Sequence, residues 1–334
     1  MSEDVLKAAL VGAGMISLYH LRAWQSAGVE IVAVCDIDRE SAQKRADEFG
    51  IARVYDDPKS LFADGGFDLV DIAASVTAHD EVTRLAADQG VHVILQKPMV
   101  ETVAQAEDLI SYVGDRVRFM IHENYRFRPH YRAVREWINQ GRIGEVRHIN
   151  MVCRGSGLCP REGQEPFLVE RQPYLKTFRR NLVFETMIHH LDVCRAIAGP
   201  LKVVAARLNR LATGLPGEDT ASILMEGENG LIATADGCIC APGYPDLHGD
   251  RLEVIGTTGT IIMDYNRIYL VGDEENAIEV DLLGRYQESF DAATSAFVEG
   301  VRTGEPFETD RIDNLQTLRL MESVYDAAGV ESVA

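Results

Sequence analysis

Residues 8–36, AALVGAGMISLYHLRAWQSAGVEIVAVCD, decide the fold of this chain. An apolar run reaches Gly12-Ala13-Gly14, a helical pattern follows, and a second apolar run ends at Asp36. This order of strand, glycine turn, helix, strand and acid is typical of a dinucleotide-binding βαβ unit. Gly12 permits the tight turn, Gly14 lets backbone N–H groups approach a pyrophosphate, and Asp36 can accept both hydroxyls of an adenosine ribose. Ser17 stands at the third glycine position, which predicts slightly looser packing of the helix on the strand.

Strands and helices alternate through about residue 121. The runs FDLVDIAAS (67–75), VHVILQKP (91–98) and VRFMI (117–121) are almost continuously apolar, which favours strands buried on both faces of a parallel sheet. Between them, Gly50 is typical of a helix end and Asp57-Pro58 of a helix start. We therefore predict a doubly wound α/β fold whose ligand binds beyond the carboxyl ends of the strands.

The second half of the chain has a different rhythm. We expect a helix over 128–144, a strand near 145–153, a loop over 154–180 and one apolar helix over 182–198. Strand-like runs follow at 201–209, 219–226, 230–238, 250–256, 259–264 and 267–271, and helical patterns at 285–303 and 311–329 close the chain. Successive hairpins predict a mostly antiparallel, open-faced sheet in an α+β domain, with one face available to a partner subunit.

The predicted domains are therefore a Rossmann domain over 1–122 and an α+β domain over 123–334. The C-terminal helix is long enough to pack back on the first of them.

Composition excludes several classes of protein. The 334 residues carry a net charge of −19, whereas nucleic-acid binders usually present a basic face. No apolar run approaches the ~20 residues that span a bilayer, and MSEDVLKAAL lacks the pattern of a signal peptide, so we expect a cytoplasmic protein. The six cysteines form no CxxC pair, and we interpret them as reduced thiols.

Two sets of residues carry candidate chemistry. Lys97 follows the apolar run VILQ at a strand end, where a lysine either stays in water or binds and polarises a substrate oxygen. Glu185, His189 and Asp192 are spaced i, i+4 and i+7 on the apolar helix, so they form one polar stripe. Such a stripe is either a structural network in the core or an acid–base site built on the imidazole. His190 points about 100° away from His189 and should not serve the same site.

Other polar residues are weaker candidates. Basic side chains cluster in 126–135 and 176–180, where they either bind an anionic substrate or, more commonly, pair with acidic surface residues. His79 is better explained by packing or capping than by catalysis. No HxxE or HxxxH metal spacing occurs, so we predict no metal site.

The pieces GAGMISLYH, QKPM, NYRF and ETMIHHLD together resemble the glucose–fructose oxidoreductase/inositol dehydrogenase (Gfo/Idh/MocA) family, in family order and spacing. QKPM, HENYRF and the QPYL…E-x-x-x-H stretch are similar to the branch that contains D-apiose-type aldose dehydrogenases. The resemblance implies a Rossmann domain, a second domain on an open-faced sheet, dimers or tetramers joined through that sheet, and NAD(P)-linked oxidation of sugars or polyols.

Several residues match the family motifs. Lys97 matches the family's active-site lysine, and Glu185 and His189 match its acid-xxx-His motif, with Asp192 also matching. Two positions depart from the pattern. Gln96 replaces a glutamate, which removes a negative neighbour from Lys97, and Ala74-Ser75 replaces a common Thr-Pro at the nicotinamide.

These considerations define the expected site. We expect catalytic roles for Lys97, His189 and Glu185. We expect substrate contacts from Lys97, Asn124, Tyr125, Arg126 and Asp192. We expect cofactor contacts from Gly12, Gly14, Met15, Ile16, Asp36, Arg39, Ala74, Ser75, His79, Gln96 and Lys97.

The resulting hypothesis is an NAD(P)-dependent oxidoreductase that removes a hydride from a carbinol of a sugar or sugar-derived polyol. His189 takes the hydroxyl proton while Lys97 polarises the same oxygen. Asp36 favours NAD by repelling a 2′-phosphate, although Arg39 leaves NADP open. The alternatives are a non-enzymatic NAD-binding sensor or partner protein, and a sugar–sugar oxidoreductase that retains its cofactor. We expect a homodimer or homotetramer.

Overall fold

The structure is a computed structural model that describes residues 5–247, 249–281 and 284–330. It divides into two compact units. The first holds the chain up to Phe127 together with Tyr286–Leu318, and the second holds Arg128–Arg285 and the chain from Arg319 onward. This division differs from the expected boundary after residue 122, because residues 286–303 pack against the first helix of the chain and belong to the first unit.

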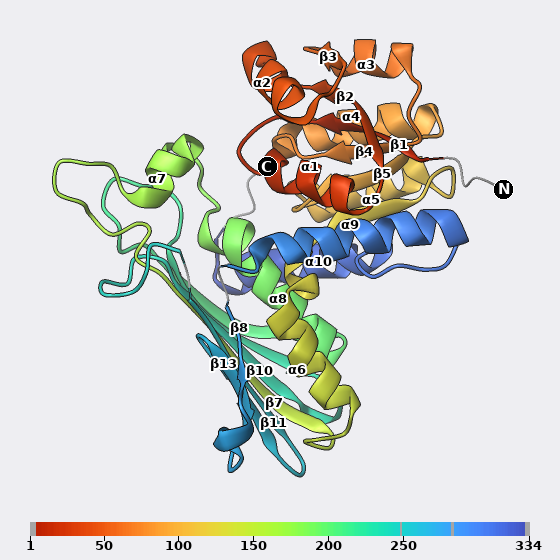
Figure 1. The fold of residues 1–334 in the computed structure, drawn as a ribbon. Helices are drawn as coiled ribbons and strands as arrows, with labels where there is room; N and C mark the ends of the chain where they lie inside the picture. Colours follow the sequence, from red (N-terminus) through yellow and green to blue (C-terminus); the bar gives the residue numbers. More distant parts are fainter. Residues whose placement is uncertain (1–4, 248, 282–283, 331–334) are drawn as a thin grey trace. The chain divides into compact units, whose positions relative to one another are not determined.

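The first unit is built on a six-stranded sheet of order β3-β2-β1-β4-β5-β6 (Figure 1). Every strand pair in it is parallel. Its strands are β1 (Lys7–Val11), β2 (Glu30–Cys35), β3 (Arg53–Tyr55), β4 (Leu69–Ile72), β5 (His92–Gln96) and β6 (Phe119–His122). Strands β2 and β3 follow β1 toward one edge of the sheet, and β4 to β6 follow toward the other edge. The strand order therefore switches between β1 and β4, and doubly wound sheets bind ligands at such a switch point.

The helices of the first unit are α1 (Ser17–Ser26), α2 (Arg39–Phe49), α3 (Pro58–Asp64), α4 (Val76–Asp88), α5 (Val103–Val113) and α9 (Tyr286–Thr303), with a 3₁₀ turn, η1 (Asn124–Phe127). Local signals set several of their ends, as predicted. Gly50 ends α2 in the left-handed conformation, and the Asp57 side chain caps α3 with Pro58 at its first position. One cluster of the core contains Trp24 of α1 and Phe297 of α9. They pack there with Leu69 of β4 and Ile94 of β5.

The second unit is built on an eight-stranded sheet of order β14-β13-β12-β11-β7-β10-β9-β8. Its strands are β7 (Val146–Arg154), β8 (Leu201–Asn209), β9 (Thr220–Gly227), β10 (Ile232–Cys238), β11 (Gly249–Gly256), β12 (Thr260–Asp264), β13 (Arg267–Leu270) and β14 (Ile278–Glu279). All pairs are antiparallel except β7 with β10, so the predicted fold class is confirmed.

The helical segments of the second unit are α6 (Pro129–Asn139), α7 (Phe167–Arg171), η2 (Pro173–Lys176), η3 (Leu182–Met187), α8 (Ile188–Ala198), η4 (Glu228–Gly230) and η5 (Glu274–Asn276). The last helix, α10 (Arg311–Ala327), passes from the first unit into the second. Helices α6 and α8 lie on one face of the sheet, where they contact β12, β7 and β10 (Figure 1). Of the helices in the described ranges, none has both the length and the apolar composition needed to cross a membrane.

Two local expectations for this unit need correction in detail. The loop expected over 154–180 contains α7 and η2. The helix expected over 182–198 begins as a π-helix, η3, and becomes an α-helix only at Ile188. The i, i+4, i+7 stripe of Glu185, His189 and Asp192 assumed a regular α-helix, so that geometry does not hold at Glu185, which lies in the π-helical part.

Candidate active site

The turn after β1 shows why each of its two glycines is present. Gly12 has a φ of +101°, and a Cβ there would lie 2.4 Å from the backbone N of Ala74, so the fold requires glycine. A Cβ on Gly14 would meet no described protein atom within 4 Å. The fold therefore does not require Gly14, and the backbone there is open to the close approach that a pyrophosphate needs.

Asp36 is bonded to this turn. One carboxylate oxygen accepts the Ala13 N–H at 2.6 Å and the other accepts the Asp38 N–H at 2.8 Å. A carboxylate offers about four lone-pair sites, so both oxygens retain capacity for ribose hydroxyls. Arg39 is exposed and pairs with Asp56 at 3.4 Å. The exposed Gly14 and Met15, with Ile16 at the start of α1 and Asp36 beside them, fit a bound NAD.

Ser17, at the third glycine position, is fully buried. Its hydroxyl donates to the carbonyl of Gly14 and accepts from Arg45 Nε at 2.8 Å. The hydroxyl thus ties the turn to α2, a role that a glycine could not perform.

Two strand ends of the first unit are joined by His79. Its Nδ1 lies 3.0 Å from the Pro98 carbonyl oxygen, and its Nε2 lies 3.1 Å from that of Ala74. Burial lowers the pKa of His79, although its carbonyl partners act in the opposite direction. The ring therefore positions the turns after β4 and β5, which carry Ser75 and Lys97. The contact of His79 with the cofactor stays a prediction.

Gln96, at the end of β5, belongs to a polar network that the sequence did not reveal. Its Nε2 lies 3.1 Å from His20 Nε2, and the opposite ring nitrogen of His20 lies 2.8 Å from Asp71 Oδ2. The one signal available in the sequence was the acid Asp71 inside an otherwise apolar strand.

The predicted substrate contacts Asn124, Tyr125 and Arg126 are all buried in η1. The Asn124 amide donates to Ser289 Oγ at 2.8 Å, and Arg126 pairs with Asp313 at 2.7 Å. Arg126 therefore follows the ion-pair alternative weighed for the basic cluster. Direct contact of these three residues with substrate stays a prediction.

In the second unit, His189 and Asp192 are buried on α8, and Glu185 lies one turn earlier in η3. The Asp192 carboxylate has Arg195 at 3.7 Å. Partial burial, together with the Glu185 carboxylate and its hydrogen bond, raises the pKa of Tyr174 in η2. The segment expected to be a loop thus brings a phenol to Glu185.

Glu218 binds the backbone at the irregular start of this helix. Its carboxylate accepts the N–H groups of Asn181 and Val183 at 3.1 and 3.0 Å, and the Tyr325 hydroxyl at 2.7 Å. Burial raises the pKa of Glu218 even though these donors oppose the shift. Sequence reasoning missed this residue, which anchors the segment that carries Glu185.

His190 has a partner of its own. Its Nε2 bonds Asp250 at 2.8 Å, and the Tyr131 hydroxyl donates to the same carboxylate at 2.7 Å. Burial alone would lower the pKa of His190, but the Asp250 carboxylate outweighs it and holds that pKa well above the usual range. One potential metal-ligating atom from each of Cys153, His190 and Asp250 lies within 4.8 Å of the others, but hydrogen bonds already occupy the imidazole and the carboxylate.

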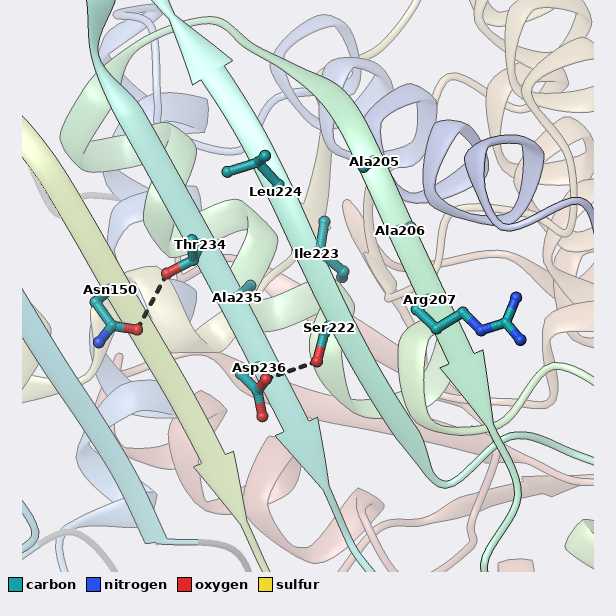
Figure 2. A pocket seen from close by; sticks show the side chains of 10 residues that line it. All are labelled: Asn150, Ala205, Ala206, Arg207, Ser222, Ile223, Leu224, Thr234, Ala235 and Asp236. Atoms are coloured by element: carbon teal, nitrogen blue, oxygen red, sulfur yellow. Dashed lines mark hydrogen bonds between the residues drawn. The ribbon is translucent and has the colours of Figure 1, made fainter.

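A hollow of about 420 Å³ lies elsewhere, on the sheet face opposite α6 and α8 (Figure 2). Four of its polar side chains form two hydrogen-bonded pairs: Thr234 donates to Asn150 at 3.1 Å and Ser222 to Asp236 at 2.7 Å. Its lining includes none of the expected site residues. The hollow is therefore a feature of the open sheet face and not of the chemistry.

Comparison with known proteins settles the family. Residues 6–121 match the model of an oxidoreductase family with an NAD-binding Rossmann fold, and residues 131–262 match the GFO/IDH/MocA C-terminal domain. The chain belongs to the GFO/IDH/MocA family. The suspected resemblance is thereby confirmed, and NAD is the cofactor for which this family's Rossmann fold is built.

Relatives within the GFO/IDH/MocA family match almost the whole chain. A D-apiose dehydrogenase from Rhizobium rhizogenes is 32% identical over 98% of this chain and 96% of its own length. A D-apiose dehydrogenase from Paraburkholderia graminis is 31% identical over 96% of this chain and 87% of its own. The crystal structure of an oxidoreductase from Agrobacterium radiobacter with NAD⁺, L-tartaric acid and magnesium superposes with a TM-score of 0.88 at 29% identity, covering 97% of this chain and 96% of that one.

Proposed function

We propose that this chain is an NAD-dependent dehydrogenase that oxidises a hydroxyl group of a sugar or sugar-derived polyol, with D-apiose as the leading substrate. The observation that carries the proposal is the bonded Gly12–Gly14 turn with Asp36, in a chain that aligns end to end with D-apiose dehydrogenases. Inositol 2-dehydrogenases are more distant relatives, which supports a polyhydroxylated substrate as the class.

The residues have distinct proposed roles. NAD, when bound, supplies the hydride acceptor. His189 takes the proton of the reacting hydroxyl, a task that suits an imidazole near neutral pH and is worth ~10²–10⁴-fold in rate. Lys97, at the end of β5, binds and polarises the substrate oxygen. Glu185 and Asp192 orient the imidazole or bind neighbouring hydroxyls.

Cofactor choice follows from Asp36. A carboxylate at the end of β2 accepts ribose hydroxyls and repels a 2′-phosphate, which favours NAD over NADP. The exposed Arg39 is paired with Asp56, so NADP binding would have to compete with that ion pair.

Formation of NADH on mixing the protein with NAD and a substrate tests the proposal. We expect D-apiose to give turnover and NADP to react more slowly than NAD. A panel of aldoses, aldonates and inositols extends the search, with thermal shift in the presence of NAD as the binding assay. Absence of both NADH formation and sugar-dependent thermal shift across the panel would contradict the proposal.

The same assay separates the two alternatives. A sugar–sugar oxidoreductase would retain its nucleotide through gel filtration and release no net NADH. A non-enzymatic NAD-binding protein would show a thermal shift with NAD alone and no chemistry with any sugar.

We also propose that the open sheet face joins two copies of the chain. Leu224 and Ile232 are 38% and 48% exposed on this face, and Arg207 and Glu226 lie beside them. An apolar patch with charges of both signs suits a self-complementary interface.

A further inference from the structure

A buried hydrogen-bonded chain leads from the middle of the first unit's sheet to the backbone of Lys97. His20 Nδ1 lies 2.8 Å from Asp71 Oδ2, and His20 Nε2 lies 3.1 Å from Gln96 Nε2. At the end of the chain, Gln96 Oε1 accepts the Lys97 backbone N–H at 2.8 Å. His20 and Asp71 are fully buried.

The chemistry of the Gln96 amide gives every bond in this chain a direction. Because the Lys97 N–H is a donor, the amide oxygen must face it, and the NH₂ group must face His20. An NH₂ group only donates, so His20 Nε2 must present a lone pair. The ring proton then lies on Nδ1, from which it is donated to Asp71. An imidazolium would set two donors against each other at Nε2, and turning the amide over would only move that clash to the Lys97 N–H.

The surroundings hold His20 in this orientation. Its ring packs against the rings of His122 and Phe290, with centroids 4.5 and 5.1 Å away. The indole N–H of Trp24 donates to the same Asp71 oxygen at 2.6 Å. Burying a carboxylate in an apolar strand is costly unless the carboxylate accepts hydrogen bonds. Here the hydrogen bond with His20 also fixes a single tautomer of the imidazole.

We propose that His20, held as the neutral Nδ1–H tautomer between Asp71 and Gln96, is a positioning residue that fixes the backbone at Lys97. The inference rests on the proposed function only in giving Lys97 a chemical role. The hydrogen-bonded chain itself requires no substrate.

The first test is the tautomer. Protein labelled with ¹⁵N in its histidines, with NAD bound, gives the protonation of each ring nitrogen from long-range ¹H–¹⁵N correlations, and the His20 signal is assigned by its loss in His20→Asn. We expect Nδ1 protonated and Nε2 bare at neutral pH. In Gln96→Glu the new carboxylate accepts from both the Lys97 N–H and the ring, so we expect both nitrogens protonated. A proton on Nε2 of the wild-type ring would overturn the proposal.

The second test uses two substitutions at position 20, each of which keeps one of the two hydrogen bonds made by the His20 ring. Asn at position 20 reproduces Nδ1 and keeps the bond to Asp71, whereas Gln reproduces Nε2 and keeps the bond to Gln96. We expect His20→Asn to accelerate hydrogen exchange at the Lys97 amide by at least about tenfold and to lower kcat by about as much, since small misplacements of reacting groups cost up to ~10²-fold. His20→Gln should stay within about threefold of wild type in both.

The outcomes separate the proposal from its premise. If the two substitutions changed Lys97 amide exchange and kcat equally, and only as far as each lowers the melting temperature, the role of His20 would be merely structural. That result would overturn the inference. Faster Lys97 exchange in His20→Asn alone, without turnover on any sugar, would support the positioning chain and count against the proposed function instead.

Discussion

The Asp36 carboxylate accepts the backbone N–H of Ala13 at 2.6 Å, so the acid at the end of β2 is bonded directly to the glycine turn after β1. Replacing it removes a charged acceptor from the turn and, under the proposed function, from the ribose as well. Hydrogen bonds to charged groups are worth about 1.5–3 kcal/mol, so Asp36→Ala should weaken NAD binding by about 10–100-fold and reduce the preference over NADP. Calorimetric titration with both nucleotides measures this. Asp38→Ala is the matched control, because it removes only the cap of α2 and should leave NAD affinity unchanged.

The two glycines of the turn should respond differently to alanine. Gly12→Ala places a Cβ 2.4 Å from the Ala74 backbone at a φ of +101°, and should destabilise the protein by about 2–4 kcal/mol. Gly14→Ala meets no described protein atom within 4 Å, so its melting temperature should stay near wild type while NAD affinity falls. Chemical denaturation and NAD titration of both variants check the contrast. A strongly destabilised Gly14→Ala would contradict the ligand-based explanation of that glycine.

His189→Ala should remove a proton acceptor without touching the nucleotide turn. We expect turnover to fall by ~10²–10⁴-fold and the NAD dissociation constant to stay near wild type. Steady-state kinetics and nucleotide titration give the two numbers. The control is His92→Gln at the start of β5, the end of that strand away from Lys97, which should retain activity. Parallel loss of turnover and NAD affinity in His189→Ala would remove the residue from its proposed role.

The buried His190–Asp250 pair makes the stability of the protein depend on pH. The pKa of His190 is raised in the folded protein, so the pair's contribution is complete below the unfolded value of about 6.5 and is lost as pH rises through the folded value. Urea unfolding between pH 6 and the alkaline range should therefore show the difference between wild type and His190→Gln shrinking as pH increases. At the acidic end we expect the substitution to cost about 1.5–3 kcal/mol, because it removes a charged hydrogen bond to a buried carboxylate that keeps Arg128 at 3.6 Å. A difference that does not vary with pH would contradict a charged His190.

If the open sheet face joins two copies, a charge placed on it should change the oligomeric state. Leu224→Arg places a charge in its apolar patch and should shift the protein toward monomer in sedimentation experiments. Ile312→Arg, an exposed apolar residue of the first unit, is the control and should leave the assembly unchanged. A monomeric wild-type protein would contradict the proposed interface.

Local signals made much of the first unit predictable. The Gly12–Gly14 turn, the acid at position 36, the Gly50 helix end and the Asp57-Pro58 helix start each depend on residues within a few positions of one another. The parallel sheet and its strand-end Lys97 followed from apolar runs of the right length. The family motif then singled out Glu185 and His189, although not their geometry.

The amino-acid sequence by itself therefore determined the dinucleotide turn, the order of strands and helices, and the residue types available for chemistry. Only the tertiary structure decided how they are held. Asp71 meets His20 across 51 positions of the chain, Tyr131 meets Asp250 across 119, and Glu218 reaches back 37 positions to the start of the π-helix. Each of these is a buried polar group that needs a partner, and no periodicity or propensity says which distant residue supplies it. That is why the regular elements could be predicted locally, whereas the π-helical start at Leu182 and the tautomer of His20 could not.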